Sequence, residues 1–469
     1  MLSKYLLKGC GLLYGLFSYG VFLFLAAKEG SIFRRMSEKA KKELSIARRK
    51  FWDLTETPYG LKHDFFILSS GVKLHYVTTG PPPGRPGQPT NLVIFLHGFP
   101  DSWVLWQNLL RSKRLAQNAV LAAVDLPGYG GSDGLPQYDA TTVLETITAF
   151  ILCMREEYTG EARGSPTERG KVIIVSHDWG AAIAFRLAAE APQLADRFIT
   201  SSVFLPTLLL ANIQGRWSSA MQMLKSGAGQ PRSLRLLRTA ASTLCPVLTQ
   251  LKKSGYVFIF LLPAPLANSF GSFGNYYVLR MMQQIAAKSK HPLEGTELAE
   301  AMAQSLGPSV EQCADDGYSE DVRRRAPSGG WSEKIRYYRE GAATGSWDKS
   351  IETVVSLSNL ERAGGRRRSS SGAGLFEDGP KGALKAKVTF VVGLKDVAID
   401  PTLAFEGIGD YFSRESQMVT LPEAGHWTPS EKEGAAVLEE VTAWALEGEY
   451  GTVRERLQKF PGAKVTVER

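Results

Sequence analysis

The sequence predicts an α/β protein: a mostly parallel central sheet with an inserted helical cap, preceded by one transmembrane helix. Three observations lead to this prediction. Short apolar runs alternate with helical patterns in both halves of the chain, the alternation stops between residues 207 and 382, and an uncharged stretch lies near the amino terminus. With 469 residues, 44% of them hydrophobic, the chain has enough apolar side chains for one large domain with an insertion.

The amino-terminal stretch, residues 9–27, carries no charge and is just long enough to cross a bilayer as a helix. A cleaved signal peptide is the alternative. Its apolar core would be shorter, however, and the sequence Ala26-Ala27-Lys28 is a poor cleavage site. The sequence therefore predicts a single-pass membrane protein anchored through residues 9–27.

A basic segment, residues 28–63, follows the predicted anchor. Between Lys28 and Lys50 it has nine basic and three acidic residues, a net +6 that accounts for most of the chain's formal +8. Positive charge beside a membrane helix favours the cytosolic side, so we expect the globular part in the cytosol. The same charge attracts anionic head groups, which makes membrane lipid an expected partner. No base-stacking or groove-reading motif occurs, so nucleic acid is not an expected partner.

The four cysteines form no C-x-x-C pair, and Cys10 lies in the apolar stretch. Neither a disulfide framework nor a zinc site is indicated, which favours a reducing compartment. The sequence contains no motif for a metal or an organic cofactor, and none is expected.

The first part of the predicted core, residues 64–206, begins with an antiparallel sheet edge. Phe65 to Thr79 reads as two alternating strands around a Ser-Ser-Gly turn. Asn91 to Leu96 is then a buried strand that ends in His97-Gly98-Phe99-Pro100. Because ligands of open α/β sheets bind at the carboxyl ends of the strands, the Phe99 N–H is a candidate oxyanion donor. An ordinary strand-to-helix turn is the alternative.

Residues 171–182 predict a strand, a sharp turn and a helix, with Asp178 at the centre of the turn. The small residues Ser176 and Gly180 stand two positions to either side, as is needed where strand and helix backbones nearly touch. A serine must lose a proton before it attacks, whereas a carboxylate is ionised at pH 7 and attacks a saturated carbon unaided. We therefore expect an alkyl ester on Asp178. The alternative is a buried aspartate that caps the following helix.

A second stretch, Gly130 to Gly134, matches the pattern G-x-S-x-G literally. The preceding strand, Ala119 to Val124, does not run directly into Ser132, and no helix begins at Gly134. The structural context of a nucleophile is missing, so Ser132 is not expected to be one.

Residues 207–382 are predicted to form a helical cap inserted into the sheet domain. Within the cap, Tyr256 to Pro263 is apolar but too short to cross a membrane, and we expect it to face a pocket. Near its end comes Trp331 to Arg339, which is rich in aromatic and basic residues. Residues 363–380 include a low-complexity run of Arg, Ser and Gly and are expected to form a disordered loop.

The second part of the core, residues 383–449, resumes the strand pattern. Lys387 to Val392 is a strand followed closely by Asp396, and Gln417 to Leu421 is a strand followed closely by His426. Both side chains are therefore expected on the same rim of the sheet as Asp178. For His426 alone, a structural loop histidine is the alternative. Residues 450–469 are expected to form a C-terminal tail.

These motifs together resemble the epoxide hydrolases of the α/β-hydrolase superfamily, from about Phe65 to Leu446. The resemblance implies the α/β-hydrolase fold, with the chain order nucleophile, acid and histidine that this fold uses. The motifs that carry it are His97-Gly98-Phe99-Pro100, Ser176-His177-Asp178-Trp179-Gly180, Gly393-Leu394-Lys395-Asp396 and Gly425-His426-Trp427.

The resemblance also implies a reaction. A small hydrophobic epoxide would be attacked by Asp178, and water activated by His426, oriented by Asp396, would release a vicinal diol. The N–H groups of Phe99 and Trp179 would hold the oxyanion of the second step. No metal or organic cofactor is implied.

The family also has two cap tyrosines that hold the epoxide oxygen. Tyr256, seven residues before Pro263, fits the first. Tyr338, before Arg339, fits the second, but Tyr337 stands where the family usually has tryptophan and is a rival. The cap is also longer than is typical of the family.

The layout of an N-terminal anchor and a cytosolic catalytic domain is similar to the microsomal branch of the family and implies the endoplasmic reticulum. Two other functions stay open. A haloalkane dehalogenase shares the aspartate nucleophile but needs a second halide donor after His-Gly, where Phe99 has no side-chain donor. A non-catalytic, membrane-tethered binding protein on the same scaffold is the other alternative.

Overall fold

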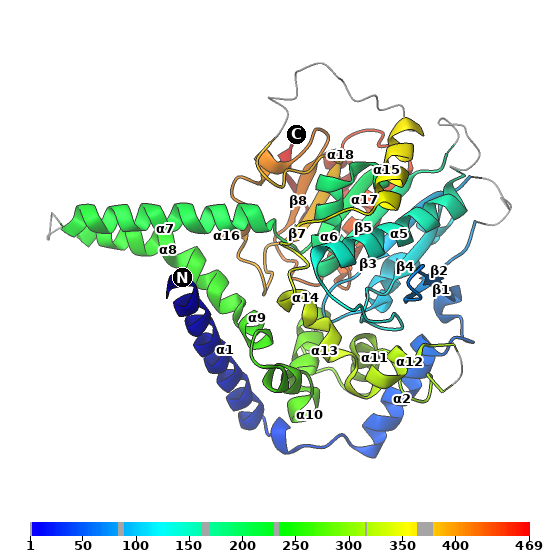
Figure 1. The fold of residues 1–469 in the computed structure, drawn as a ribbon, viewed down its shortest axis with the longest axis horizontal. Helices are drawn as coiled ribbons and strands as arrows, with labels where there is room; N and C mark the ends of the chain where they lie inside the picture. The colour runs from blue at the N-terminus through cyan, green and yellow to red at the C-terminus, as the bar shows by residue number, and fades with distance from the viewer. Residues whose placement is uncertain (1, 83–88, 161–168, 229–233, 315–316, 364–378) are drawn as a thin grey trace.

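The computed structural model describes residues 2–82, 89–160, 169–228, 234–314, 317–363 and 379–469. Within these residues a nine-stranded sheet runs through the centre of the protein in the order β1-β2-β4-β3-β5-β6-β7-β8-β9 (Figure 1). The strands from β4 to β8 pair in parallel, and β1, β2 and β9 add antiparallel edges, which confirms the mostly parallel sheet. The strands are β1 Lys62–Ile67, β2 Lys73–Thr78, β3 Asn91–Leu96, β4 Ala119–Val124, β5 Val172–His177, β6 Arg197–Ser201, β7 Val388–Gly393, β8 Gln417–Leu421 and β9 Lys464–Glu468.

Helices cover both faces of the sheet, so the central strands are apolar throughout their length. In β5, the side chain of Ile174 packs in one hydrophobic cluster with α5 and α6. Its neighbours Ile173 and Val175 pack in the opposite cluster with α3, α4 and α17. These helices are α3 Gln107–Leu110, α4 Lys113–Ala116, α5 Ala140–Thr159, α6 Trp179–Glu190 and α17 Lys432–Leu446.

The register of the parallel strands brings the ends of four of them to one edge. Leu96 of β3 lies opposite Ser176 of β5, and Gly393 of β7 lies opposite Leu421 of β8. The loops that follow these strands therefore leave the sheet side by side, which is where open α/β sheets bind ligands.

The inserted cap consists of helices and lies over this edge (Figure 1). Its first two helices form a long hairpin that projects from the body of the protein. The last helix of the insertion, α15, packs instead beside α5 of the core. The helices are α7 Pro206–Ala228, α8 Leu234–Lys253, α9 Gly255–Phe260, α10 Ala264–Ala287, α11 Gly295–Leu306, α12 Glu320–Arg325, α13 Trp331–Lys334, α14 Arg336–Arg339 and α15 Ile351–Ala363.

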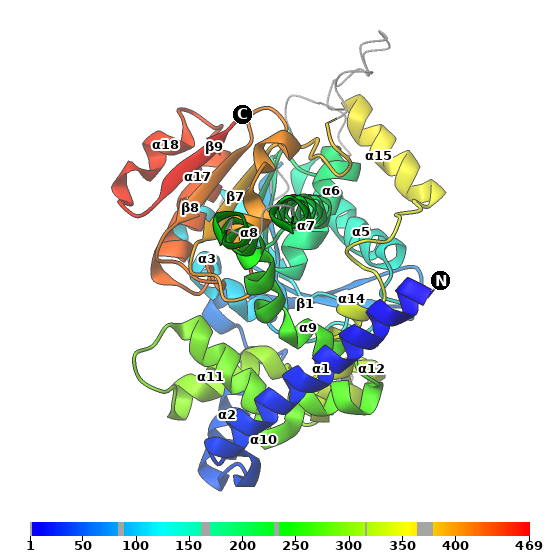
Figure 2. The same ribbon diagram turned by 90° about the vertical axis from the view of Figure 1, so that its left-hand side faces the viewer.

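The amino-terminal segment forms two helices that both pack on the cap (Figure 2). Helix α1, Leu2–Lys28, lies along α9 and α10, and its part from Lys8 to Lys28 is long and apolar enough to cross a membrane. Helix α2, Glu38–Trp52, starts at the capping residue Ser37 and packs on α11. Its last residue, Trp52, is buried and donates from Nε1 to the carbonyl of Ala303 at 3.0 Å. The basic segment is thus folded onto the globular domain.

The carboxyl terminus differs from the expected tail. Residues 464–468 form β9, which pairs antiparallel with β8 and closes that edge of the sheet. The prediction of a tail over residues 450–469 is therefore wrong, because a five-residue edge strand gives too short a pattern to stand out in the sequence. The expected disordered loop at residues 363–380 falls mostly on residues 364–378, which lie outside the described part of the chain.

Short helical segments complete the fold. They are η1 Ser31–Phe33, η2 Pro58–Gly60, η3 Trp103–Trp106, η5 Pro192–Leu194, η6 Ala326–Ser328, α16 Pro401–Phe405, η8 Ile408–Tyr411, α18 Val453–Arg456 and η9 Leu457–Lys459.

Candidate active site

Asp178 occupies the sharp turn between β5 and α6. Its backbone has φ 51° and ψ −117°, a left-handed conformation that a non-glycine residue rarely adopts. A Cβ at Gly180 would collide with the backbone carbonyls of Leu96 and His97, so only glycine allows α6 to begin this close to β3. The Asp178 side chain makes no capping hydrogen bond to α6. Its carboxylate is therefore available to other groups, which argues against the capping alternative.

The two carboxylate oxygens of Asp178 have different neighbours. Oδ1 accepts a hydrogen bond from the backbone N–H of Phe99 at 2.8 Å. Oδ2 lies 3.6 Å from Nε2 of His426. Gly98 lies against this carboxylate and against the backbone of Trp179: a Cβ added at Gly98 would collide with the Asp178 side chain and would lie 2.7 Å from the Trp179 nitrogen. The two predicted oxyanion donors, the N–H groups of Phe99 and Trp179, therefore flank Asp178.

The charge of Asp178 is held by these neighbours. Burial alone would raise the pKa of the carboxyl group, but His426, His177 and the Phe99 N–H together hold it below its usual value. The side chain is still 17% exposed. Asp178 is thus an ionised, accessible carboxylate at neutral pH.

His426 is fixed by Asp396, which follows β7. The imidazole Nδ1 lies 2.8 Å from Oδ2 of Asp396. The other oxygen of Asp396 accepts from the backbone N–H groups of Ala398 at 2.6 Å and Ile399 at 3.0 Å, which holds the carboxylate in place. Burial lowers the pKa of His426, but the carboxylates of Asp396 and Asp178 outweigh burial and raise it to about 10. In the free protein the imidazole is therefore a cation between two anions.

Two residues that sequence reasoning gave no role hold the backbone of His426. His177 Nε2 lies 2.9 Å from the His426 carbonyl oxygen, and the Ser202 hydroxyl donates to the same oxygen at 2.5 Å. Burial lowers the pKa of His177 to about 4, so its ring is neutral and donates from Nε2. The position of His177 directly before Asp178 could have indicated a role in the site. Ser202 follows β6 in a stretch of sequence with no pattern that points to the site.

The structure places Tyr256 and Tyr338 together on the cap side of Asp178. Their ring centroids are 6.1 Å apart, and Tyr338 lies edge-on to Trp179 at 4.9 Å. Burial, and next to it the negative charge of Asp178, raises the pKa of Tyr256. Burial also raises the pKa of Tyr338, with further contributions from Tyr256 and Asp178. Both phenols therefore stay protonated and lie within the electrostatic reach of Asp178.

The rival tyrosine, Tyr337, points elsewhere. It is 1% exposed, packs against Tyr129 and Tyr138, and donates its hydroxyl to the carbonyl of Pro127 at 3.0 Å. Adjacent residues of a short helix lie on different sides of it, so only one of the pair faces Asp178. In this structure that residue is Tyr338.

Aromatic side chains pack around Tyr256 and Tyr338 of the cap. Phe99 lies 5.6 Å from Tyr338 and 5.3 Å from Phe260, measured between ring centroids, and Tyr256 lies 5.5 Å from Phe260. Surroundings of this kind favour apolar groups and offer few polar partners beyond the two phenols. The stretch from Tyr256 to Phe260 thus faces the site with two of its aromatic rings.

The cap and the core are also joined beside the site by Asp101, which sequence reasoning did not select. This buried carboxylate accepts from Trp427 Nε1 at 2.9 Å and from the cap residues Gln304 at 2.8 Å and Gln283 at 3.3 Å. Burial raises the pKa of Asp101 to about 6. The residue therefore links α10 and α11 of the cap to the residue that follows His426.

Ser132 is a structural residue in a different part of the fold. It is fully buried, its hydroxyl donates to the carbonyl of Asp125 at 2.6 Å, and it accepts from the backbone N–H of His75 at 2.9 Å. The described residues contain no group of three or more His, Cys, Asp or Glu side chains placed to hold a metal ion.

Comparisons with known proteins identify the family of this chain. The sequence matches the model of the Alpha/beta hydrolase family over residues 93–440. It is 34% identical over 139 residues to Epoxide hydrolase 3 from Mus musculus, which covers 29% of this chain and 32% of that protein. It is 28% identical over 204 residues to Epoxide hydrolase 1 from Caenorhabditis elegans, with 43% of this chain and 42% of that protein covered. The chain thus spans about a third to two fifths of the length of these relatives.

Solved structures show the same architecture. The Cif epoxide hydrolase from Acinetobacter nosocomialis superposes with a TM-score of 0.52 at 16% identity, covering 88% of this chain and 96% of that one. At this identity the likeness concerns the fold. Since the family match extends from β3 to α17 and takes in most of the chain, the protein belongs to the alpha/beta hydrolase family.

Proposed function

We propose that this protein is an epoxide hydrolase that converts a small hydrophobic epoxide and water to a vicinal diol through an ester on Asp178. One observation carries the proposal. An ionised carboxylate is flanked by the His426–Asp396 pair on the sheet side and by two protonated tyrosines from the cap. The names of the relatives from mouse and nematode support the same activity.

In the first half-reaction, Asp178 attacks the less hindered epoxide carbon in line with the breaking carbon–oxygen bond. The ring oxygen leaves as a basic alkoxide, which needs a proton. Tyr256 and Tyr338 hydrogen-bond this oxygen, and one of them donates the proton. Their raised pKa values keep both phenols in the donor form at neutral pH.

In the second half-reaction, His426 first releases its own proton, because the ester has removed the charge of Asp178, and this proton restores the tyrosine that donated one. The neutral imidazole then removes a proton from water, which attacks the carbonyl carbon of the ester. Asp396 holds the imidazole in orientation and stabilises the imidazolium that forms. The N–H groups of Phe99 and Trp179 hold the oxyanion, and each such donor contributes roughly 3 kcal/mol. As this intermediate collapses, the carbon–oxygen bond of the ester breaks and His426 gives its proton to the leaving alkoxide, which departs as the diol. The Asp178 carboxyl group then returns a proton to His426 and is again a carboxylate.

The decisive experiment is a single turnover of an epoxide in ¹⁸O-water, followed by mass analysis of the product and of the peptide that contains Asp178. We expect the label in the Asp178 carboxylate after one turnover and in the diol only in later turnovers. Label that enters the diol in the first turnover would mean that water attacks the epoxide directly.

The two other functions are supported less well. A halide leaves as a stable anion and needs no proton, so the two cap tyrosines would have no role in a dehalogenase. Phe99 packs its ring against Tyr338 and offers no side-chain donor to a halide. A non-catalytic binding protein would not need an ordered Asp396–His426–Asp178 series.

Attachment to a membrane through the apolar helix α1 belongs to the same proposal. The apolar part of α1, from Lys8 to Lys28, is followed by the exposed cations Arg34 and Arg35, and their attraction to the anionic cytosolic leaflet favours a cytosolic location for the catalytic domain. We assign the membrane to the endoplasmic reticulum by the layout shared with the microsomal branch. Protease protection of the domain in sealed microsomes tests the orientation.

A further inference from the structure

The α7–α8 hairpin extends away from the body of the protein and takes no part in the proposed reaction (Figures 1 and 2). From residue 206 to residue 253 the sequence contains seven Lys and Arg and no Asp or Glu. Two of these cations are bound at the base of the hairpin, Arg216 by Glu406 and Lys253 by backbone carbonyls. The exposed ones that form no ion pair among the described residues are Lys225, Arg235, Arg238 and Lys252.

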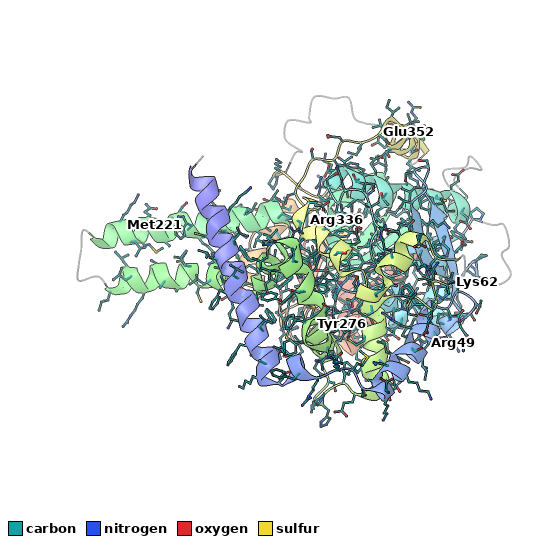
Figure 3. All side chains as sticks on the ribbon, turned by 60° about the horizontal axis from the view of Figure 1, so that its bottom comes forward. Arg49, Lys62, Met221, Tyr276, Arg336 and Glu352 are labelled. Atoms are coloured by element: carbon teal, nitrogen blue, oxygen red, sulfur yellow. The ribbon has the colours of Figure 1, made fainter. Side chains whose placement is uncertain are left out.

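Large apolar side chains are exposed along both helices of the hairpin. In α7 they recur every seventh residue, and in α8 at spacings typical of one helix face. We call this set the hairpin stripe. Figure 3 marks the outer half of the hairpin by Met221. The stripe consists of Leu210 (61% exposed), Trp217 (57%), Leu224 (37%), Leu234 (65%), Leu237 (47%), Leu248 (63%) and Leu251 (40%).

The two halves of the stripe lie on the same side of the hairpin. The buried alanines Ala220 of α7 and Ala240 of α8 mark the positions where the helices touch. Successive residues of an α-helix are rotated by roughly 100° about the helix axis. Counted in this way from the buried alanine of each helix, the exposed apolar residues of both helices are rotated away from the contact in the same sense. Because the helices run antiparallel, an equal sense of rotation brings both sets to one side.

Helix α1 extends this apolar surface. Its inner face packs closely on the cap: a Cβ at Gly15 would lie 2.5 Å from the carbonyl oxygen of Phe258, and Tyr19 hydrogen-bonds Ser269 at 2.8 Å. Tyr14 donates its hydroxyl to the carbonyl of Leu251, where α8 ends, so α1 and the hairpin meet. The outer face is apolar and exposed at Leu12, Leu13, Leu16, Phe17, Val21 and Phe24.

We propose that the hairpin stripe and the outer face of α1 form one membrane-contact surface, along which the protein lies on an anionic bilayer. The inner face of α1 contacts the cap from Gly11 to Ala26, so a helix that crossed the bilayer would have to leave these contacts. A helix that lies in the plane of the interface keeps them and exposes its apolar face to lipid. Phe33, 83% exposed beside Arg34 and Arg35, continues the surface beyond α1.

The chemistry of the surface favours lipid over a second copy of the chain or another protein. Leucine dominates the stripe, and the unpaired cations border it while acidic side chains are absent from both helices. Anionic head groups attract such cations, and acyl chains accept leucine and tryptophan side chains. This proposal keeps membrane attachment through α1 but places the helix in the plane of the membrane, in place of the single pass expected from the sequence. It does not depend on epoxide hydrolysis.

The fluorescence of Trp217 reports contact between the hairpin and lipid, because Trp217 is exposed and the other tryptophans are buried or partly buried. Full-length protein is mixed with vesicles of phosphatidylcholine and about a quarter phosphatidylserine that carry brominated acyl chains. We expect quenching of tryptophan emission that is absent in Trp217→Phe. Quenching of equal size in Trp217→Phe would overturn the proposal, as would the absence of quenching in bound protein.

Flotation of the protein with the same vesicles measures how much the hairpin contributes to membrane binding when α1 is intact. One double variant, Leu234→Ser with Leu237→Ser, removes apolar side chains and should weaken vesicle binding. A second double variant, Arg235→Gln with Arg238→Gln, should weaken binding roughly five-fold for each charge removed, and only on anionic vesicles. Ser218→Ala with Gln222→Ala, on exposed positions outside the stripe, is the matched control and should bind like the natural protein. Unchanged binding by both stripe variants would overturn the proposal. So would a change of oligomeric state in those variants without a change in vesicle binding.

The orientation of α1 is tested by an N-terminal glycosylation tag on the full chain in microsomes. A helix in the plane of the membrane leaves the tag on the cytosolic side and unmodified. Glycosylation of the tag would show that α1 crosses the bilayer, and the in-plane arrangement would then be wrong. Turnover of a short, water-soluble epoxide by the stripe variants shows that they are folded, so a failure here is distinguishable from a failure of the proposed reaction.

Discussion

His426 lies 3.6 Å from Oδ2 of Asp178, which gives the proposed nucleophile and the proposed base a direct electrostatic contact. This contact contributes to the high pKa of His426 and the low pKa of Asp178. Ester formation removes the charge of Asp178. In the proposed reaction, the pKa of His426 therefore falls, and more of its imidazole is deprotonated, once there is an ester for water to attack.

Asp178→Asn removes this charge with little change in shape and should lower the pKa of His426 from about 10 by about one unit or more. The pKa is measured by NMR from the imidazole carbon-bound protons. The raised pKa in the folded protein means that the charged imidazole stabilises the fold fully below about pH 6.5, and that this stabilisation is lost as pH rises through about 10.

The pH dependence of thermal unfolding provides the control for this prediction. Between about pH 7 and 10 the melting temperature of Asp178→Asn should fall less steeply than that of the natural protein. An unchanged His426 pKa in the variant would show that Asp396 alone sets it.

His426→Gln should separate the two half-reactions. Asp178 keeps its Phe99 hydrogen bond and can still attack the epoxide, but no base activates water. Intact-mass measurement should show protein plus one substrate accumulating within the first turnover. The double variant with Asp178→Asn should show no added mass, and full turnover by His426→Gln alone would remove His426 from its assigned role.

Tyr256→Phe and Tyr338→Phe should each slow ester formation by an epoxide, within the roughly 10²- to 10⁴-fold that a positioned general acid contributes. The double variant should lose nearly all of it. Each change removes one oxygen atom, so the fold should be retained. Stopped-flow tryptophan fluorescence in the His426→Gln background measures the step.

Tyr337→Phe is the matched control for the tyrosines. It breaks the hydrogen bond to the Pro127 carbonyl and should cost about 1 kcal/mol of unfolding free energy, with ester formation unchanged. If Tyr337→Phe slows the chemistry and Tyr338→Phe does not, the roles of the two residues are exchanged. If all three are silent and the protein releases halide from a haloalkane, the function is dehalogenation.

Ser132→Ala should leave the activity of the folded protein nearly unchanged. It removes hydrogen bonds to the Asp125 carbonyl and the His75 N–H, so it should lower the free energy of unfolding by about 1 to 3 kcal/mol. Urea unfolding and turnover are measured on the same sample. Loss of activity in a stably folded variant would revive a serine nucleophile.

The core of the fold was predictable because its signals are local. Each central strand is a short apolar run, and Asp178, Asp396 and His426 each follow such a run closely. Once parallel pairing brings the strand ends to one edge, these side chains must be neighbours. Their roles in catalysis stay predictions until they are tested.

Other features depend on contacts between distant segments and have no local signal. His177, at the end of β5, and Ser202, just after β6, both reach the His426 carbonyl. The choice between Tyr337 and Tyr338 depends on how a four-residue helix is rotated against the core. The pairing of β9 with β8 and the packing of α1 on α9 likewise follow from tertiary structure alone.

Helix α9 has α1 on its outer side and Tyr256 on the side of Asp178. Phe258, next to Gly15 of α1, and Tyr256 are only two residues apart in this six-residue helix. Anyone who shortens the chain to obtain a soluble enzyme would thus uncover Phe258 and Phe270, which α1 covers through Tyr14 and Phe22. Such a shortened protein would be prone to aggregate and would hold Tyr256 less rigidly, so its turnover would underestimate that of the whole chain. Detergent extraction of the full-length protein keeps α1 packed on α9 and so keeps Tyr256 in place.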